Sequence, residues 1–144
     1  MIQIHATAVE ISGVGVLLRG PSSSGKSDLA LRLIDSGARL VADDYTDLAA
    51  EEGRLVARAP AAIAGRMEVR GLGIVEVPSV ARTRLELAVD LVESAAVERL
   101  PTARYCDYLG VQLPVLQLAP FEASAVAKLR QAVRLNARGP LFAA

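Results

Sequence analysis

Residues 14–34 read Val14-Gly15-Val16-Leu17-Leu18-Arg19, then Gly20-Pro21-Ser22-Ser23-Ser24-Gly25-Lys26-Ser27, then Asp28-Leu29-Ala30-Leu31-Arg32-Leu33-Ile34. The first block is apolar and β-branched and predicts a strand, and the last carries apolar residues at helical spacing. The middle block, residues 20–27, matches the pattern G-x-x-x-x-G-K-[ST] at every defined position. A strand, a glycine-bounded loop and a helix in this order predict a nucleotide-binding loop.

The chemistry of such a loop depends on its backbone and on two side chains. Successive backbone N–H groups curl around a phosphate, and the following helix points the positive end of its dipole at the same group. Lys26 is then expected to reach the β- and γ-phosphates, and the Ser27 hydroxyl to bind Mg²⁺. The alternative is a turn rich in serine and glycine that caps an ordinary helix.

The composition predicts one domain with an aliphatic core. Of the 144 residues, 52% are hydrophobic and only 3% aromatic, which suits a sheet covered by alanine-rich helices. The 16 basic and 16 acidic side chains cancel, so bulk charge gives no case for binding nucleic acid or an anionic membrane. The single cysteine, Cys106, excludes an internal disulfide. Because the sequence shows no cleavable leader and no bilayer-spanning run, a cytoplasmic domain is expected.

The segments around the loop predict a mixed α/β domain. Residues 2–11 predict a strand, Ser12-Gly13 a turn, and residues 14–19 the second strand of an antiparallel hairpin. Further elements are expected as follows: strands at residues 39–42, 85–91 and 113–118, a second hairpin at residues 47–57, and a helix at residues 124–137. No linker or internal repeat divides the chain.

Residues 67–77 form a strand-like run that is interrupted by two glycines. Gly71 and Gly73 stand two apart, which suggests a loop where the backbone closely approaches another group. Glu68 and Arg70 come just ahead of them. Glu68 is a candidate for a metal site or proton relay, and Arg70 for neutralising charge on a transferring phosphoryl group. An ordinary surface ion pair is the alternative.

Asp43 and Asp44 stand where a strand next to the loop is expected to end. Carboxylates in that position can hold Mg²⁺ or accept a proton from an attacking hydroxyl. Because adjacent side chains of a strand face opposite ways, the two are expected to have different roles. An Asx turn that closes the strand is the alternative. His5 is the only histidine and lies in the first predicted strand, where a structural role is the simpler interpretation.

Together these segments resemble the catalytic domain of HPr kinase/phosphorylase, a bifunctional bacterial enzyme that acts on a serine of the phosphocarrier protein HPr. Residues 1–144 are expected to be this one domain, without the N-terminal domain that the family usually carries. The resemblance rests on residues 20–27, on Val41-Ala42-Asp43-Asp44, on Glu68-Val69-Arg70-Gly71-Leu72-Gly73 and on Leu109-Gly110-Val111-Gln112-Leu113-Pro114. It implies an α/β fold, a P-loop domain with a mixed sheet similar to the nucleotide-binding core of phosphoenolpyruvate carboxykinase.

The resemblance implies an ATP-dependent protein serine kinase that uses Mg²⁺, reverses its reaction by phosphorolysis and regulates the phosphotransferase system. Residues 20–27 would bind the ATP phosphates. The other implied site residues are His5, Asp43 and Asp44 around the serine oxygen, Ser27, Asp44 and Glu68 at the metal, and Arg70 at the phosphates. The partner would be an HPr-type phosphocarrier protein, and the enzyme a homo-oligomer, as the family forms hexamers.

Two departures from the family pattern bear on activity. Ser23 stands where the family usually has glycine, a position that can need a backbone conformation that serine disfavours, so reduced nucleotide affinity is expected. Residues 119–124 include Glu122 where the family carries basic residues. The short form is similar to those of α-proteobacteria, and a kinase with weak or altered phosphorolysis is expected.

Two other functions stay open. A P-loop kinase for a small metabolite would be expected to carry a lid-like, arginine-rich insertion or a base-binding segment, and neither is evident. An ATP-sensing module without catalysis is favoured by Ser23. It is disfavoured by Asp43, Asp44 and Glu68, because a sensor does not need a proton acceptor.

Overall fold

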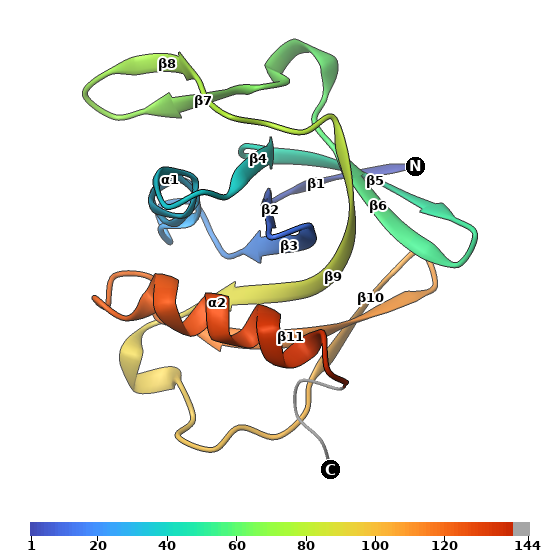
Figure 1. The fold of residues 1–144 in the computed structure, drawn as a ribbon, viewed down its shortest axis with the longest axis vertical. Helices are drawn as coiled ribbons and strands as arrows, with labels where there is room; N and C mark the ends of the chain where they lie inside the picture. The colour runs from blue at the N-terminus through green and yellow to red at the C-terminus, as the bar shows by residue number, and fades with distance from the viewer. Residues whose placement is uncertain (140–144) are drawn as a thin grey trace.

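Figure 1 shows the computed structural model, which describes residues 1–139 as a bent sheet accompanied by two helices. The strands are β1 (Ile2–His5), β2 (Thr7–Ile11), β3 (Val14–Arg19), β4 (Arg39–Ala42), β5 (Tyr45–Glu51), β6 (Arg54–Arg58), β7 (Arg66–Val69), β8 (Gly73–Glu76), β9 (Arg82–Leu91), β10 (Tyr105–Tyr108) and β11 (Val111–Leu118). The helices are α1 (Lys26–Asp35) and α2 (Ala125–Asn136), with 3₁₀ turns at Ala61–Ile63 and Ser94–Ala96. Neither α-helix of this described part has the length and apolarity needed to cross a membrane.

The main sheet is mixed, as predicted. It has nine strands in the order β1-β5-β6-β9-β3-β2-β4, with β11 beside β9 and β10 beside β11. β9 is parallel to β3 and β11, and the other pairs are antiparallel. Residues 82–84 of β9 pair with β6, and from residue 85 onward β9 pairs with β3. Figure 1 shows β9 curving from one half of the sheet into the other.

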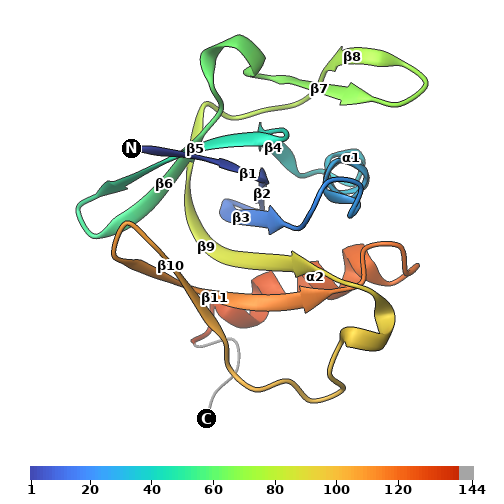
Figure 2. The same cartoon turned by 180° about the vertical axis from the view of Figure 1, so that it is seen from behind.

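The side chains of β3 alternate and so contribute to two cores. Val16 and Leu18 belong to the cluster that contains α1 and α2, whereas Leu17 belongs to the cluster enclosed by the two halves of the sheet. Leu29 and Leu33 of α1 are fully buried, and each such leucine stabilises the fold by about 2 kcal/mol. Figure 2 shows from behind that β5 and β6 lie away from both helices.

β7 and β8 form a separate two-stranded sheet that lies over α1 (Figure 1). Met67 is buried in the helix-side core, and Val69 and Val75 pack against it. Gly71 and Gly73 have φ values of 92° and 94°, and a Cβ at either position would meet nothing within 4 Å. No atom of residues 1–139 therefore makes the predicted close approach, and glycine is needed here for the left-handed backbone of the turn.

The first predicted strand is in fact two strands. The backbone turns at Ala6, whose N–H donates to the carbonyl two residues earlier at 3.2 Å. β1 therefore pairs with β5, and β2 with β3 and β4. The break leaves His5 at the end of β1 beside Tyr45, its register partner. β4 also pairs with β2 rather than β3, so one strand separates Asp43 from the strand that leads into the loop of residues 20–27.

Candidate active site

The 20–27 loop connects β3 to α1 and has the backbone of a phosphate cradle. Ser23 and Gly25 have left-handed φ values of 66° and 100°, and Gly25 is the N-cap of α1. Turns of this kind point successive N–H groups into one concavity beside the positive end of the helix dipole. The Ser24 hydroxyl is buried here and has no hydrogen-bond partner within residues 1–139, which leaves it available to a ligand.

Lys26 is buried and folds back onto its own loop. Its ammonium donates to the carbonyl of Gly20 at 2.6 Å and to that of Pro21 at 2.9 Å. Burial lowers the pKa of the Lys26 ammonium below its ordinary value, while the negative charges of Asp44 and Asp43 act in the opposite direction. A phosphate oxygen would compete well with the two carbonyls, because a hydrogen bond between two charged groups is stronger than one to a neutral acceptor.

Asp43 is the buried acid of the site. Its Oδ1 accepts hydrogen bonds from Ser27 Oγ at 2.7 Å and from Thr7 Oγ1 at 3.3 Å. Ser27 is the loop residue that the motif assigns to Mg²⁺. The Asp43 carboxylate therefore lies where it could bind the same ion, directly or through a water molecule.

Asp44 is turned away from Asp43 by a three-residue turn. The Tyr45 N–H donates to the Asp43 carbonyl at 2.8 Å, and Asp44 between them has a φ of 69°. This is the strained conformation of a γ-turn. Thr7 fixes the turn as well, because its hydroxyl accepts from the Asp44 N–H at 3.2 Å. The two acids meet different partners, as predicted, although a turn rather than strand alternation separates them.

His5 contacts Asp44 at the exposed edge of the site. His5 Nε2 lies 2.7 Å from Asp44 Oδ1, and because an ionised carboxylate only accepts, the imidazole donates from Nε2. The side chains of His5 and Asp44 are 39% and 55% exposed, so a group outside the chain can reach the carboxylate. The Tyr45 ring, centred 5.3 Å from the imidazole, limits how far His5 can turn.

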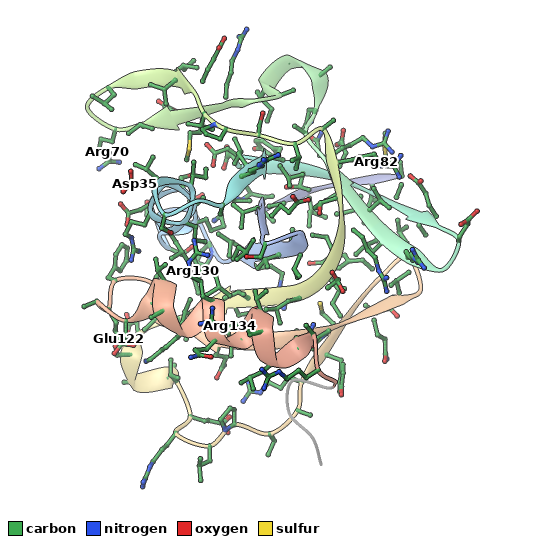
Figure 3. All side chains as sticks on the ribbon, in the orientation of Figure 1. Asp35, Arg70, Arg82, Glu122, Arg130 and Arg134 are labelled. Atoms are coloured by element: carbon green, nitrogen blue, oxygen red, sulfur yellow. The ribbon has the colours of Figure 1, made fainter. Side chains whose placement is uncertain are left out.

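Glu68 and Arg70 are not brought together with these residues. Both belong to the β7–β8 hairpin and are exposed, and Figure 3 shows Arg70 on the side of the hairpin that faces α1. No three acids, histidines or cysteines of residues 1–139 lie close enough together to hold a metal. Glu68 therefore does not form a preformed cluster with Asp43 and Asp44.

Two features of the site carry no motif and are found only in the structure. Thr7 is fully buried and links both acids, but a threonine in a β-rich run gives no signal of such a role. Arg19 ends β3 and donates from Nε and Nη2 to Asp90, its register partner on β9, at 2.7 and 2.9 Å. Its Nη1 donates to Tyr108 Oη at 3.2 Å. This network raises the pKa of Arg19 and fixes the strand end where the loop begins.

The residues present fit a nucleotide with Mg²⁺. The concave backbone, Lys26 and the unpartnered Ser24 hydroxyl offer donors to anionic oxygens. Mg²⁺ keeps several waters and takes one or two carboxylates together with phosphate oxygens. Ser27 and Asp43, already joined at 2.7 Å, are a donor set of this kind.

Comparison with known proteins gives the same family at three levels. The family model described as HPr Serine kinase C-terminal domain matches residues 1–139. The HPr kinase/phosphorylase of Chlorobium limicola is 38% identical over 148 residues, which cover 93% of this chain and 44% of that protein. That of Clostridium tetani is 48% identical over 77 residues, which cover 54% of this chain and 25% of that protein.

A solved structure extends the likeness to the fold. The Hpr(Ser) kinase/phosphatase from Coxiella burnetii superposes with a TM-score of 0.85 at 30% identity, over 96% of this chain and 100% of that chain. The chain spans less than half the length of the curated relatives named above.

Proposed function

The chain belongs to the HPr serine kinase C-terminal domain family, and we propose that it transfers the γ-phosphoryl group of ATP to a serine of an HPr-type phosphocarrier protein. One observation carries the proposal. The Ser27–Asp43 pair and the His5–Asp44 pair, each at 2.7 Å, lie side by side next to the 20–27 loop. Phosphoryl transfer depends on positioning and charge neutralisation. This arrangement offers a phosphate-binding loop, two side chains that could hold one Mg²⁺ ion, and an accessible base.

The loop would hold the ATP phosphates through its backbone N–H groups, while Lys26 exchanges its two carbonyl partners for phosphate oxygens. Ser27 and Asp43 would hold Mg²⁺, which supplies positive charge beside the phosphates when it is bound. The hydrogen bond to Ser27 favours Asp43 over Asp44 as the first metal ligand. The family resemblance adds Glu68 at the metal and Arg70 at the phosphates, and both would approach from the β7–β8 hairpin.

Asp44 would accept the proton of the serine hydroxyl while the serine oxygen attacks the γ-phosphorus and ADP leaves. His5 would keep the carboxylate in place through its Nε2–H. In the reverse direction, inorganic phosphate attacks the phosphoserine, Asp44 returns the proton to the serine oxygen, and pyrophosphate leaves. We also propose that phosphorolysis is weak. The family carries basic residues in the loop after β11, whereas this chain carries Glu122 there, which pairs with Lys128 at 3.3 Å.

We also propose the fold type, the oligomeric state and the location of the enzyme. A core like that of phosphoenolpyruvate carboxykinase is supported by the antiparallel hairpin of β2 and β3 ahead of the loop. A homo-oligomer, a hexamer by family resemblance, is supported by the apolar side chains of Leu72 and Ile74, which are 76% and 74% exposed on the β7–β8 hairpin. The cytoplasm is the proposed location. The proposed domain spans residues 1–144, of which residues 140–144 lie outside the described part.

The test is transfer of label from γ-labelled ATP to the HPr-type protein of the same organism in the presence of Mg²⁺. Label on a serine of that protein, lost with Lys26→Ala and retained at saturating ATP with Lys128→Ala, is the expected result. Lys128 is the matched control because it is the only other lysine of the chain and lies on α2. Measurable ATP binding without label on the protein would contradict the proposal.

An ATP-sensing module is the second candidate, and the strained Ser23 backbone, with a φ of 66°, favours it. Substitution of the acids separates the two functions. For a kinase, Asp43→Asn and Asp44→Asn strongly lower turnover while the chain still folds and binds ATP. For a sensor, both variants behave like the wild type.

A further inference from the structure

Phe121 lies in the loop between β11 and α2 and covers the glycine that begins α1. A Cβ placed on Gly25 would lie only 2.8 Å from the Cζ of Phe121 and 3.2 Å from the Cγ of Pro120. The phenyl ring is thus packed against the backbone of the 20–27 loop. Nevertheless, the residue is 71% exposed, which leaves much of its surface without a protein partner.

The backbone that carries Phe121 is held in place on both sides. Pro120 is buried, and its carbonyl accepts a hydrogen bond from the Arg32 guanidinium of α1. Arg32 is itself fixed by Asp28, one turn earlier in α1, at 3.0 Å. After Phe121, Glu122 pairs with Lys128 of α2, and Figure 3 shows Glu122 in this loop. The ring is therefore presented from an anchored segment.

The order of the strands sets Phe121 opposite the acids. In the sheet, β9 and β11 lie on one side of β3, and β2 and β4 on the other. Asp43 and Asp44 follow β4, whereas Phe121 follows β11. Figures 1 and 2 show the β11–α2 loop on the same side of the molecule as α1. A nucleotide with its γ-phosphate toward the acids would extend its base toward the β11 side.

We propose that Phe121 is the platform on which the purine base of the bound nucleotide stacks. An exposed aromatic face beside a polyphosphate cradle offers the base a flat apolar surface, and stacking of this kind tolerates either purine because every base has a π-face. The inference rests on the proposed function, since it requires a nucleotide in the 20–27 loop. It adds the base-binding residue of the same site.

The test compares ATP with inorganic tripolyphosphate, which carries the phosphates without a base. Both are titrated by calorimetry into the wild type, Phe121→Ala, Phe121→Tyr and, as a control, Tyr105→Ala. Phe121→Ala is expected to weaken ATP binding by about 5- to 100-fold, the range for one stacked base, and to leave the affinity for tripolyphosphate unchanged. Phe121→Tyr retains ATP affinity. Tyr105→Ala changes neither ligand, because this exposed aromatic lies on β10.

Three results would overturn the inference. Unchanged ATP affinity in Phe121→Ala would show that no base stacks there, as would equal wild-type affinity for ATP and tripolyphosphate. An equal loss for both ligands would show that Phe121 only shapes the loop. In each case the proposed function survives, because phosphates still bind. If the wild type bound neither ligand, the proposed function itself would fail.

Discussion

The acids after β4 and the β7–β8 hairpin both lie beside α1, yet they are held by different means. Asp43 and Asp44 follow a strand of the nine-stranded sheet, and each has a side-chain partner at 2.7 Å. The hairpin is a separate two-stranded sheet that packs on α1 through apolar side chains, while Glu68 and Arg70 are exposed. One region is preorganised in the free chain, and the other presents its polar groups to solvent.

The acid pair is therefore the part of the site that is in place before substrates bind. A preorganised group costs nothing to orient when the reaction occurs, so the acid pair is expected to determine the chemical step. A two-stranded hairpin depends on neighbouring elements for its stability, so Glu68 and Arg70 are expected to contribute when nucleotide, metal or a partner protein meets them. The following substitutions test this contrast, from the largest expected effect to the smallest.

Asp44→Asn should have the largest effect. It removes the proposed proton acceptor while keeping the size of the side chain, so kcat for serine phosphorylation should fall by about 10²- to 10⁴-fold. Asp47→Asn is the control, because Asp47 also carries a hydrogen bond to a neighbouring strand, from Gln3 at 2.9 Å, without touching the acids. Steady-state rates with the HPr-type protein measure both. A loss below 10-fold in Asp44→Asn would show that another group accepts the proton.

Thr7→Val should have the next largest effect. The hydroxyl joins the Asp43 carboxylate to the Asp44 backbone, so its removal loosens both acids and should lower kcat by about 10-fold, with about 1–2 kcal/mol lost from the free energy of unfolding. Thr83→Val is the control, since Thr83 is also buried and donates to Glu10 at 3.1 Å, outside the site. Denaturation and rate measurements on both variants should show similar stability losses, but a rate loss only for Thr7→Val. Equal rates would mean that Thr7 does not position the acids.

Glu68→Gln and Arg70→Ala should have smaller effects that separate binding from turnover. Because both side chains are exposed and belong to a separate two-stranded sheet, ATP affinity should stay within about 2-fold of the wild type. Turnover should fall by about 5- to 10-fold if the hairpin contributes in the complete complex. Calorimetry and kinetics on the same preparations give both values. A large loss of ATP affinity would place these residues in the nucleotide site of the free chain and remove the contrast between the regions.

The acid pair and the hairpin also show what the sequence can predict. The strand–loop–helix order of residues 14–35 is a local pattern with strong propensities, and the structure confirms it. The acid pair does follow a strand, but that strand pairs with β2 and not with the strand that leads into the loop. The break at Ala6 and the turn at Asp44 were not predicted, because both arise from pairing between distant strands that no short window contains. The hydrogen bonds of Thr7 to both acids could not be predicted for the same reason. The glycines of the hairpin were recognised, but the sequence did not show that the left-handed turn requires them, since a turn and a close approach both favour glycine.

Ser23→Gly should give the smallest effect, with the opposite sign. Serine at a φ of 66° is strained, so glycine should raise the free energy of unfolding by up to about 1 kcal/mol and increase ATP affinity a few-fold. Ser22→Gly is the matched control, because its backbone is not left-handed and the added freedom should not help. Thermal unfolding and ATP titration measure both. Equal stability and equal ATP affinity of the two variants would show that Ser23 does not strain the loop.

The division of roles between the two acids can be tested by the Mg²⁺ dependence of the kinase rate in Asp43→Asn and Asp44→Asn. Asp43→Asn is expected to raise the Mg²⁺ concentration for half-maximal rate, because Asp43 is the acid bonded to Ser27. Asp44→Asn should lower the maximal rate and leave that concentration unchanged. The reverse pattern, with Mg²⁺ dependence shifted only in Asp44→Asn, would contradict it.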